Sequence, residues 1–281
     1  SCGPERLAYG APRDLLLGLG FISSEGRKIS AGGQVVKNVA GYDLTRFMTG
    51  SAGALGFLTR LTFRTFQRPR ACLMASAPGS LDACAAAAAS LLVSTAEPTY
   101  IAAVPETESG LDSTWRLMIG LEGLADSTAA RLSRVRTMFS EVGLGRIETR
   151  EYSCWPGPWE DILGPVYDKD FLIQLALPLT LVRNGFSALK QSFGPARWFL
   201  DFGRGLVPAG ADGLEPEAWA EIAARAEALE GRIMLIRADE EFKKGRGVFG
   251  LARPDWEMTA RIKNALDPAG VFSPGCLPGG I

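Results

Sequence analysis

Three regularly spaced glycines constrain the fold of this chain more than any other feature of its sequence. Gly50, Gly53 and Gly56 recur at every third position. Gly50 and Gly53 lie between an expected helix over residues 42–48 and an expected strand over residues 55–66, and Gly56 falls at the start of that strand. Glycine tolerates positive φ angles and lets another group lie directly on the backbone, and exposed amides in such a loop can bind an anion or the edge of a flat ring. A tight connection that binds nothing has the same spacing, so the glycines alone leave both interpretations open.

Several kinds of site are excluded by the sequence. The glycine block lacks the order G-x-G-x-x-G, and no Gly-Lys-Ser/Thr follows it, so it is neither a Rossmann fingerprint nor a phosphate loop. The chain contains no histidine, which excludes a Ser-His-Asp triad, a Cys-His dyad and the common histidine-based metal sites. We therefore expect no metal site and expect a cofactor to supply any chemistry. A base would be a tyrosine, a lysine or a carboxylate, and the sequence identifies no catalytic residue.

Charge and cysteine usage narrow the class of protein further. The formal net charge of −1 offers no basic field for nucleic acid, so we expect no nucleic-acid partner. Five scattered cysteines without a C-x-x-C pair predict reduced thiols in a cytoplasmic protein. No apolar run is long enough to span a bilayer.

The texture of the sequence predicts three regions, 1–70, 71–237 and 238–281. A proline among charged residues at 67–70 marks the first boundary. The middle region alternates strands and helices in a rhythm that suits ferredoxin-like units, and it predicts an α+β domain built from two similar halves. The mixed charge run over 239–246 is expected to be a solvated loop. Outside the glycine block, we expect strands over 15–22, 71–76, 100–104, 115–121, 171–177, 198–202 and 232–236, and helices over 80–93, 127–142, 181–193, 216–229 and 257–266.

Four stretches of the sequence resemble one known family. Residues 37–44 (KNVAGYDL) and 50–56 (GSAGALG) resemble the vanillyl-alcohol oxidase/p-cresol methylhydroxylase (PCMH) family of FAD-linked oxidases, whose second block usually reads Gly-Ser-x-Gly-x-Leu-Gly. Residues 9–18 are similar to the family's Gly-x-x-Arg-Asp-x-x-Leu-Gly element, and residues 267–275 to its closing Asp-Pro-x-x-x-(Phe/Leu)-Asn-Pro-Gly. Within this family, the sequence of residues 32–41 is most similar to that of the FAD-binding subunit of glycolate oxidases.

The resemblance implies a fold, a cofactor and a set of binding residues. The fold would be α+β, with the second lobe of a PCMH-type FAD-binding domain in 1–70, a ferredoxin-like cap or substrate domain with an antiparallel sheet in 71–237, and a return to the FAD domain in 238–281. The family's first lobe carries the loop that binds the pyrophosphate and has no counterpart here, so we expect this chain alone to hold little FAD. Ala52 replaces a residue that relatives commonly have acidic or polar, and Ser273 replaces the family's Asn. The residues implied to bind FAD are Arg13, Asp14, Lys37, Asn38, Gly41, Tyr42, Asp43, Gly50, Ser51, Gly53, Gly56, Leu58 and Thr59.

The function implied by the resemblance is that of an FAD-binding subunit of a 2-hydroxy-acid oxidase or dehydrogenase of the glycolate type. The flavin would accept a hydride from a small 2-hydroxy acid and pass electrons on. The expected partners are a catalytic flavoprotein subunit and an iron–sulfur subunit, through which the protein could associate peripherally with a membrane. The alternative is a non-catalytic assembly subunit that does not itself hold FAD. A third reading, a simple α+β ligand-binding protein, explains none of the motifs.

Two further groups of residues have a structural and a functional interpretation. Arg13, Arg237 and Arg246 are candidate clamps for a substrate carboxylate, with a surface or structural role as the alternative. Trp155, Trp159 and Tyr167 are expected to form a loop wall of the cap, with a substrate pocket as the alternative.

Overall fold

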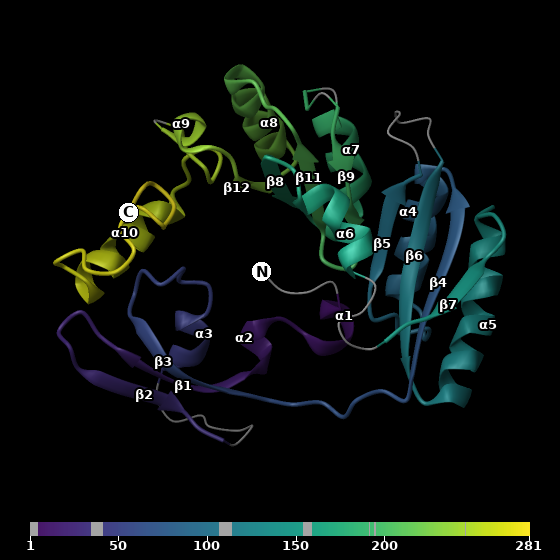
Figure 1. The fold of residues 1–281 in the computed structure, drawn as a ribbon, viewed down its shortest axis with the longest axis horizontal. Coiled ribbons are helices and arrows are strands. Elements are labelled where there is room, and N and C mark those ends of the chain that lie inside the picture. The colour runs from purple at the N-terminus through teal and green to yellow at the C-terminus, as the bar shows by residue number, and fades with distance from the viewer. Residues whose placement is uncertain are drawn as a thin grey trace. The chain divides into compact units, whose positions relative to one another are not determined.

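The computed structural model describes residues 5–34, 42–106, 114–153, 159–190, 192–193, 195–244 and 246–281 (Figure 1). They divide into a smaller unit, residues 10–67 with 251–281, and a larger unit, residues 5–9 with 68–250. The second boundary follows Gly250, whereas the sequence suggested one after Arg237. The segment between them stays with the larger unit because the Leu235 N–H donates to the Val248 carbonyl (2.7 Å) and because Phe242 is buried in the core of that unit.

The smaller unit is built on a three-stranded antiparallel sheet. Its strands are β1 (Leu16–Ile22), β2 (Lys28–Gly32) and β3 (Phe57–Phe63), in the order β2-β1-β3. Alternation along β1 turns Leu19 and Phe21 to one face, where they pack with Met48 and Leu55. The helices of this unit are α2 (Pro12–Leu15), α3 (Leu44–Met48) and α10 (Asp255–Leu266).

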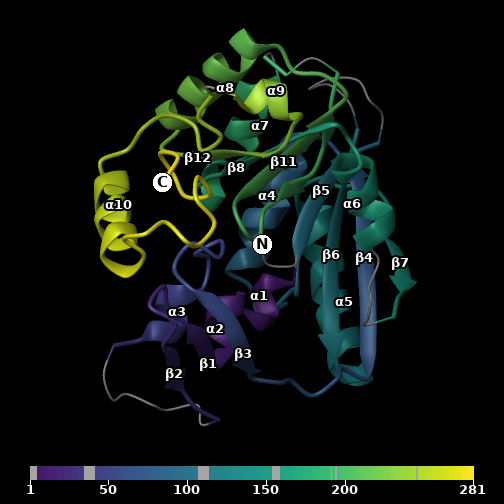
Figure 2. The ribbon, with the colours of Figure 1, turned by 60° about the vertical axis from the view of Figure 1, so that its left-hand side comes forward.

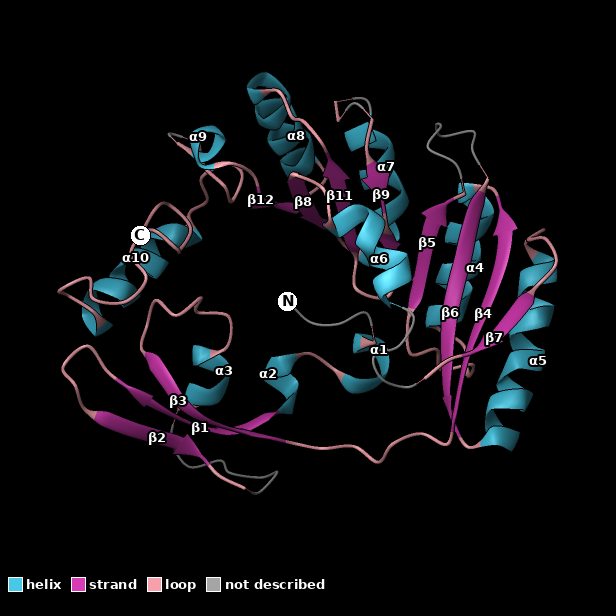
Figure 3. Cartoon of the chain, viewed as in Figure 1, coloured by secondary structure: helices cyan, strands magenta, loops and turns pink. Residues whose placement is uncertain are grey.

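The larger unit contains one nine-stranded sheet whose strand pairs are all antiparallel (Figure 3). The first half is β4 (Ala71–Gly79), α4 (Leu81–Leu92), β5 (Ile101–Pro105), β6 (Trp115–Gly123), α5 (Ala125–Glu141) and β7 (Glu148–Glu151). The second half is β8 (Phe171–Ala176), α7 (Val182–Lys190), β10 (Leu200–Asp201), β11 (Leu206–Ala211), α8 (Pro216–Ala228) and β12 (Arg232–Arg237), with β9 (Arg197–Trp198) paired to β11.

Both halves have the same topology. The sheet order β12-β8-β11-β10-β5-β6-β4-β7 places the fourth, first, third and second strand of each half side by side. A β-α-β-β-α-β unit with this order is ferredoxin-like. The halves join where β10 pairs with β5, at Leu200 opposite Ala103 and Asp201 opposite Ala102. The predicted α+β class, with an antiparallel sheet and two similar halves, is therefore confirmed.

A shared core lies between this sheet and the helices α4, α5, α7 and α8 (Figure 2). The rings of Trp115 and Trp198 both pack edge-to-face on Phe186, with centroids 4.8 and 5.0 Å away. Ser80 accepts a hydrogen bond from the Ala83 N–H and begins α4, as the sequence predicted. Since Trp115 belongs to the first half and Phe186 to the second, the two halves share one core.

Several elements were not predicted. Trp159 and Tyr167 were expected in a loop but form the two ends of α6 (Trp159–Tyr167), which packs on Leu172 and Phe199; Trp155 lies outside the described residues. The charge run expected to be a loop contains α9 (Glu240–Lys243), because the Asp239 carboxylate accepts from the Phe242 N–H (2.6 Å) and caps a helix there. The other missed elements are α1 (Arg6–Tyr9), α2, β7, β9, β11 and a 3-10 turn at Leu179–Leu181.

The expectation that the cysteines are reduced thiols is wrong for one of them. Cys72 is disulfide-bonded, whereas Cys84 and Cys276 are free. Burial raises the pKa of the Cys84 thiol to about 12. In the part of the chain that the structure describes, no helix is long and apolar enough to cross a membrane.

Candidate functional site

The start of α3 carries two of the predicted site residues. The Asp43 carboxylate accepts hydrogen bonds from the Thr45 hydroxyl (2.5 Å) and the Arg46 backbone N–H (3.0 Å), which makes it the N-cap of α3. These two hydrogen bonds, with smaller contributions from the Arg46 and Arg13 guanidinium groups, hold the pKa of Asp43 below its usual range. Tyr42, the preceding residue, is 95% exposed. An ionised carboxylate and an exposed ring are thus neighbours at this helix end.

Helix α2 carries Arg13 and Asp14. The Asp14 carboxylate accepts a hydrogen bond from the Ala11 N–H (2.9 Å), so its role in the structure is to fix the start of α2. Arg13 is exposed, and its charge acts on Asp43 because α2 packs against α3. The structure therefore brings Arg13 close to Asp43, although they belong to separate sequence motifs.

The segment 50–56, which we call the glycine turn, has an unusual backbone. The Ala54 N–H donates to the Ser51 carbonyl (2.8 Å), and the two residues between them, Ala52 and Gly53, have φ angles of +51° and +76°. Two central residues with positive φ are the mark of a type I′ turn. Gly50, with φ +89°, has no atom within 4 Å of the position that a Cβ would occupy. Its backbone is therefore open to an approaching group.

The last glycine of the turn has a packing role. A Cβ on Gly56 would lie 2.8 Å from the Phe21 ring and 3.1 Å from the Ile22 carbonyl oxygen, so only glycine lets β3 start against β1 at this point. Beyond it, Leu58 and Thr59 are exposed on β3, and Phe57 is 63% exposed. The glycine turn is therefore followed by an apolar surface.

The structure places the predicted residues of α2, the start of α3, the glycine turn and the start of β3 in one compact unit. Lys37, Asn38 and Gly41 lie outside the described residues. One residue of this region that the sequence did not single out is Lys263 of α10, whose ammonium donates to the Ala54 carbonyl of the glycine turn (2.9 Å).

Two of the three candidate carboxylate clamps hold the fold together instead. The Arg237 guanidinium donates to the carbonyls of Tyr167 (2.5 Å) and Lys169 (3.2 Å). The Arg246 guanidinium donates to the Phe242 carbonyl (2.6 Å) and lies over the ring of the same residue at 4.9 Å. Their structural interpretation is favoured, which leaves Arg13 as the exposed candidate.

Proteins with similar sequences are oxidoreductases that work on hydroxy acids or carry FAD. The Escherichia coli glycolate oxidase subunit GlcE is 49% identical over 71 residues, which are 25% of this chain and 20% of that protein. The Bacillus subtilis glycolate oxidase subunit GlcD is 42% identical over 69 residues, 25% of this chain and 15% of that protein. An uncharacterized FAD-linked oxidoreductase of Mycobacterium tuberculosis is 31% identical over 133 residues, 46% of this chain and 29% of that protein. The chain is homologous to FAD-linked oxidases.

Solved structures support the same fold. An alkyldihydroxyacetonephosphate synthase matches with a TM-score of 0.64 at 14% identity, over 97% of this chain and 55% of that one. A VAO-type flavoprotein from Myceliophthora thermophila matches with a TM-score of 0.57 at 14% identity, over 96% of this chain and 57% of that one. The chain thus spans about half the length of these two solved structures, whose fold confirms the predicted class. No family model matches the sequence.

A buried cluster of acids and phenols lies in the larger unit. The Glu122 carboxyl accepts hydrogen bonds from the hydroxyls of Tyr152 (2.8 Å) and Tyr9. The Glu5 carboxyl accepts one from the Trp159 indole N–H (3.3 Å). The ring of Tyr100 packs edge-to-face on Trp159 at 4.4 Å, and its buried hydroxyl has no hydrogen-bond partner among the described residues.

The pKa values of this acid–phenol cluster are displaced together. Burial, reinforced by the negative charge of Glu122, raises the pKa of Glu5. Burial and the same carboxyl groups also raise the pKa values of Tyr9, Tyr100 and Tyr152. The sequence signal that could have revealed the cluster is Glu122 itself, a lone carboxylic acid in the apolar strand β6.

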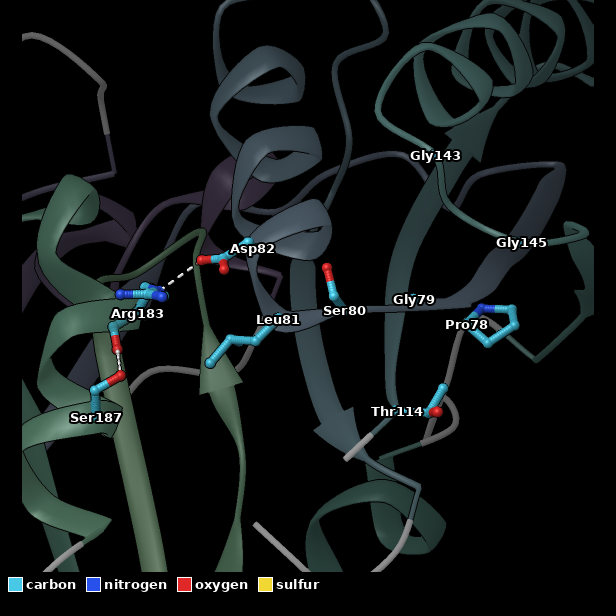
Figure 4. A pocket seen from close by; sticks show the side chains of 10 residues that line it. All are labelled: Pro78, Gly79, Ser80, Leu81, Asp82, Thr114, Gly143, Gly145, Arg183 and Ser187. Carbon is cyan, nitrogen blue, oxygen red and sulfur yellow. Dashed lines mark hydrogen bonds and ion pairs between the residues drawn. The ribbon is translucent and has the colours of Figure 1, made fainter. Parts of the chain in front are cut away.

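The larger unit also has a cavity of about 890 Å³ at the end of β4 (Figure 4). Asp82 of α4 and Arg183 of α7 form an ion pair of 2.7 Å across it, and Ser80 and Ser187 line its wall. The guanidinium already has a carboxylate partner, so a bound anion would have to compete with Asp82. Among the residues placed by the structure, no group of three His, Cys, Asp or Glu side chains is arranged to hold a metal ion.

Proposed function

We propose that this chain is the FAD-binding subunit of a 2-hydroxy-acid oxidase or dehydrogenase of the glycolate type. The observation that carries the proposal is the glycine turn, where Gly50 and Gly53 have positive φ and the Gly50 backbone is open. The 49% identity to the GlcE subunit of Escherichia coli glycolate oxidase supports the choice of substrate class. This subunit would act in a complex with a catalytic flavoprotein subunit and an iron–sulfur subunit.

The described residues fit a flavin in three respects. The open backbone at Gly50 permits a flat ring or a ribityl chain to lie against the turn. Exposed apolar groups on β3, Phe57 and Leu58, can cover a ring face. Arg13 is an exposed cation near Asp43 and could hold a phosphate or a carboxylate. When bound, FAD would supply hydride acceptance and electron transfer.

In this proposal the FAD-binding residues fall into three groups. The backbone of Gly50, Ser51, Gly53 and Gly56 would lie against the FAD. Asp43 fixes the start of α3, so that Tyr42 and the turn after the helix keep their places. The remaining proposed FAD-binding residues are Arg13, Asp14, Lys37, Asn38, Gly41, Leu58 and Thr59.

The test is retention of FAD by the purified chain after incubation with excess FAD and desalting, read from the visible flavin bands. The deciding variant is Gly50→Ala, with Gly26→Ala as the matched control, because both glycines have positive φ and open surroundings. The proposal predicts that Gly50→Ala lowers FAD retention and that Gly26→Ala does not. Equal retention by both variants, or no binding by the unaltered chain even when extended at its N-terminus, would reject the FAD-binding role.

A non-catalytic assembly subunit is the second candidate. It is favoured by the lack of histidine in the sequence and by the structural engagement of Arg237 and Arg246. In that case the chain would join its partner subunits in a complex but would retain no FAD in the same assay.

A further inference from the structure

Lys263 of α10 places a positive charge inside the smaller unit. Its side chain is 5% exposed, and the Asp267 side chain beside it is fully buried. The ammonium donates to the Ala54 carbonyl (2.9 Å), to the Phe272 carbonyl (2.7 Å) and to the Asp267 carboxylate. An ammonium has three N–H donors, so all three are used. Burying a charge is costly unless it is paired and hydrogen-bonded, and here both conditions are met.

The contact with Ala54 acts on the glycine turn. The N–H of Ala54 closes the turn on the Ser51 carbonyl (2.8 Å), and its carbonyl accepts from Lys263. The hydrogen bonds on both sides of Ala54 thus hold the turn in place. Ala54 is fully buried, whereas Ala52 and Gly53, just before it, are exposed. Lys263 therefore holds the buried end of the turn while the open residues face outward.

Asp267 connects the same lysine to the C-terminal tail. Its carboxylate accepts from the backbone N–H groups of Val271 and Phe272, each at 2.9 Å. Burial opposes ionisation, but the hydrogen bonds from Lys263 and from these two amides outweigh it and lower the pKa of Asp267. The tail then brings the Ser273 hydroxyl to 3.1 Å from the position of a Cβ on Gly53. Helix, tail and glycine turn are joined at one buried ion pair.

We propose that Lys263 is a positioning residue that sets the geometry of the glycine turn for its ligand, a role that rests on the proposed binding of FAD. No neutral side chain offers three donors from one atom, so a neutral residue would leave a turn carbonyl or the Asp267 carboxylate unpaired inside the unit. The contact that holds the turn joins Ala54 to Lys263, which is 209 residues away in the sequence. Helix α10 supplies the lysine for this contact.

The deciding variant is Lys263→Met, which keeps an apolar stem as far as the ε position and removes the ammonium group with its charge and donors. The matched control is Arg261→Met, which removes an exposed cation from the same helix. Two quantities are measured on the full chain: hydrogen exchange of the peptide covering residues 50–58, and the dissociation constant for FAD. We expect Lys263→Met to raise both by about tenfold or more, as for lost hydrogen bonds to a charged group, and Arg261→Met to change neither.

A double variant, Lys263→Met with Asp267→Asn, separates positioning from a general loss of stability. It leaves no unpaired buried charge, and the side-chain amide introduced by the second substitution keeps an acceptor for the tail. We expect its unfolding midpoint to recover towards that of the unaltered chain while exchange in 50–58 and the FAD dissociation constant stay raised. Recovery of all three, or unaltered exchange in Lys263→Met, would overturn the positioning role. If neither the unaltered chain nor the chain extended at its N-terminus binds FAD, the proposed function fails, and the exchange measurement alone decides the role of Lys263.

Discussion

The hydroxyl of Ser273 lies 3.1 Å from the position that a Cβ atom on Gly53 would occupy. Gly53→Ala would therefore meet two costs, a φ of +76° that L residues rarely adopt and a crowded contact with the tail. Gly26→Ala has the same φ of +76° but nothing within 4 Å, so it meets the first cost alone. We expect both variants to lower the free energy of unfolding in urea, Gly53→Ala by about 1 kcal/mol more. Equal losses would show that the tail gives way without cost.

Ala52 occupies a position where a different residue should make the protein more stable. It has φ +51° at the first central position of the glycine turn, where asparagine, aspartate and glycine are favoured. Ala52→Asn should raise the free energy of unfolding by about 0.5–1 kcal/mol, because asparagine tolerates this backbone conformation better than alanine does. The control is Ala269→Asn, on an exposed alanine of the same unit outside the positive-φ set. A gain in both variants, or in neither, would contradict this account of the turn.

Gly120 of β6 allows the ring of Tyr100 to reach the acid–phenol cluster. A Cβ there would lie 2.3 Å from both the Tyr100 ring and the Thr99 hydroxyl oxygen. We expect Gly120→Ala to lower the free energy of unfolding by about 1–3 kcal/mol, since these buried groups have little room to move. Gly164→Ala on α6, whose Cβ would have its nearest atom at 3.6 Å, should be neutral or stabilising by up to about 1 kcal/mol. Thermal denaturation of the two variants makes the comparison, and a tolerated Gly120→Ala would mean that Tyr100 can repack.

Glu5 should make the stability of the larger unit depend on pH. Its pKa is raised from 4.5 by burial and by Glu122, with the Trp159 hydrogen bond acting in the opposite direction. A carboxyl with a raised pKa contributes its full stability below about pH 4.5 and loses it as pH rises through the raised value. Glu5→Gln removes this term, so its stability relative to the unaltered chain should improve as pH rises. Urea unfolding across this pH range is the measurement, with the exposed Glu257→Gln as control; parallel curves for all three proteins would refute the assignment.

Helices and strands could be predicted from the sequence where a local pattern or a helix cap marked them. Alternation over residues 55–66 and the cap at Ser80 predicted elements close to the observed β3 and α4. Strand β11 was missed because Pro208 and Gly210 read as breakers, yet Gly210 is required there: a Cβ would lie 2.0 Å from the Val166 carbonyl of α6. That reason lies in a distant segment and not in the strand itself.

The candidate site divides in the same way. The glycine turn was visible in the sequence because its spacing is local, and its family resemblance added the residues around it. Lys263 was not visible, because a lone lysine in an amphipathic helix normally faces solvent and its acceptor at Ala54 is 209 residues away. Glu122 was visible as a carboxylic acid in an apolar strand, but its partners were not, since the phenols that bind it come from separate segments at Tyr9 and Tyr152.

Joining two ferredoxin-like halves through β5 and β10 determines which strands border the large sheet. The borders are β7 and β12, the last strand of each half. Every residue of β7, Glu-Thr-Arg-Glu, is exposed, and β12 begins and ends with arginine. Charged, short border strands resist pairing with strands of other molecules. Joining the halves thus pairs their inner strands β5 and β10 with each other and leaves short strands with charged residues at the two borders, where they hinder the growth of the sheet into an aggregate.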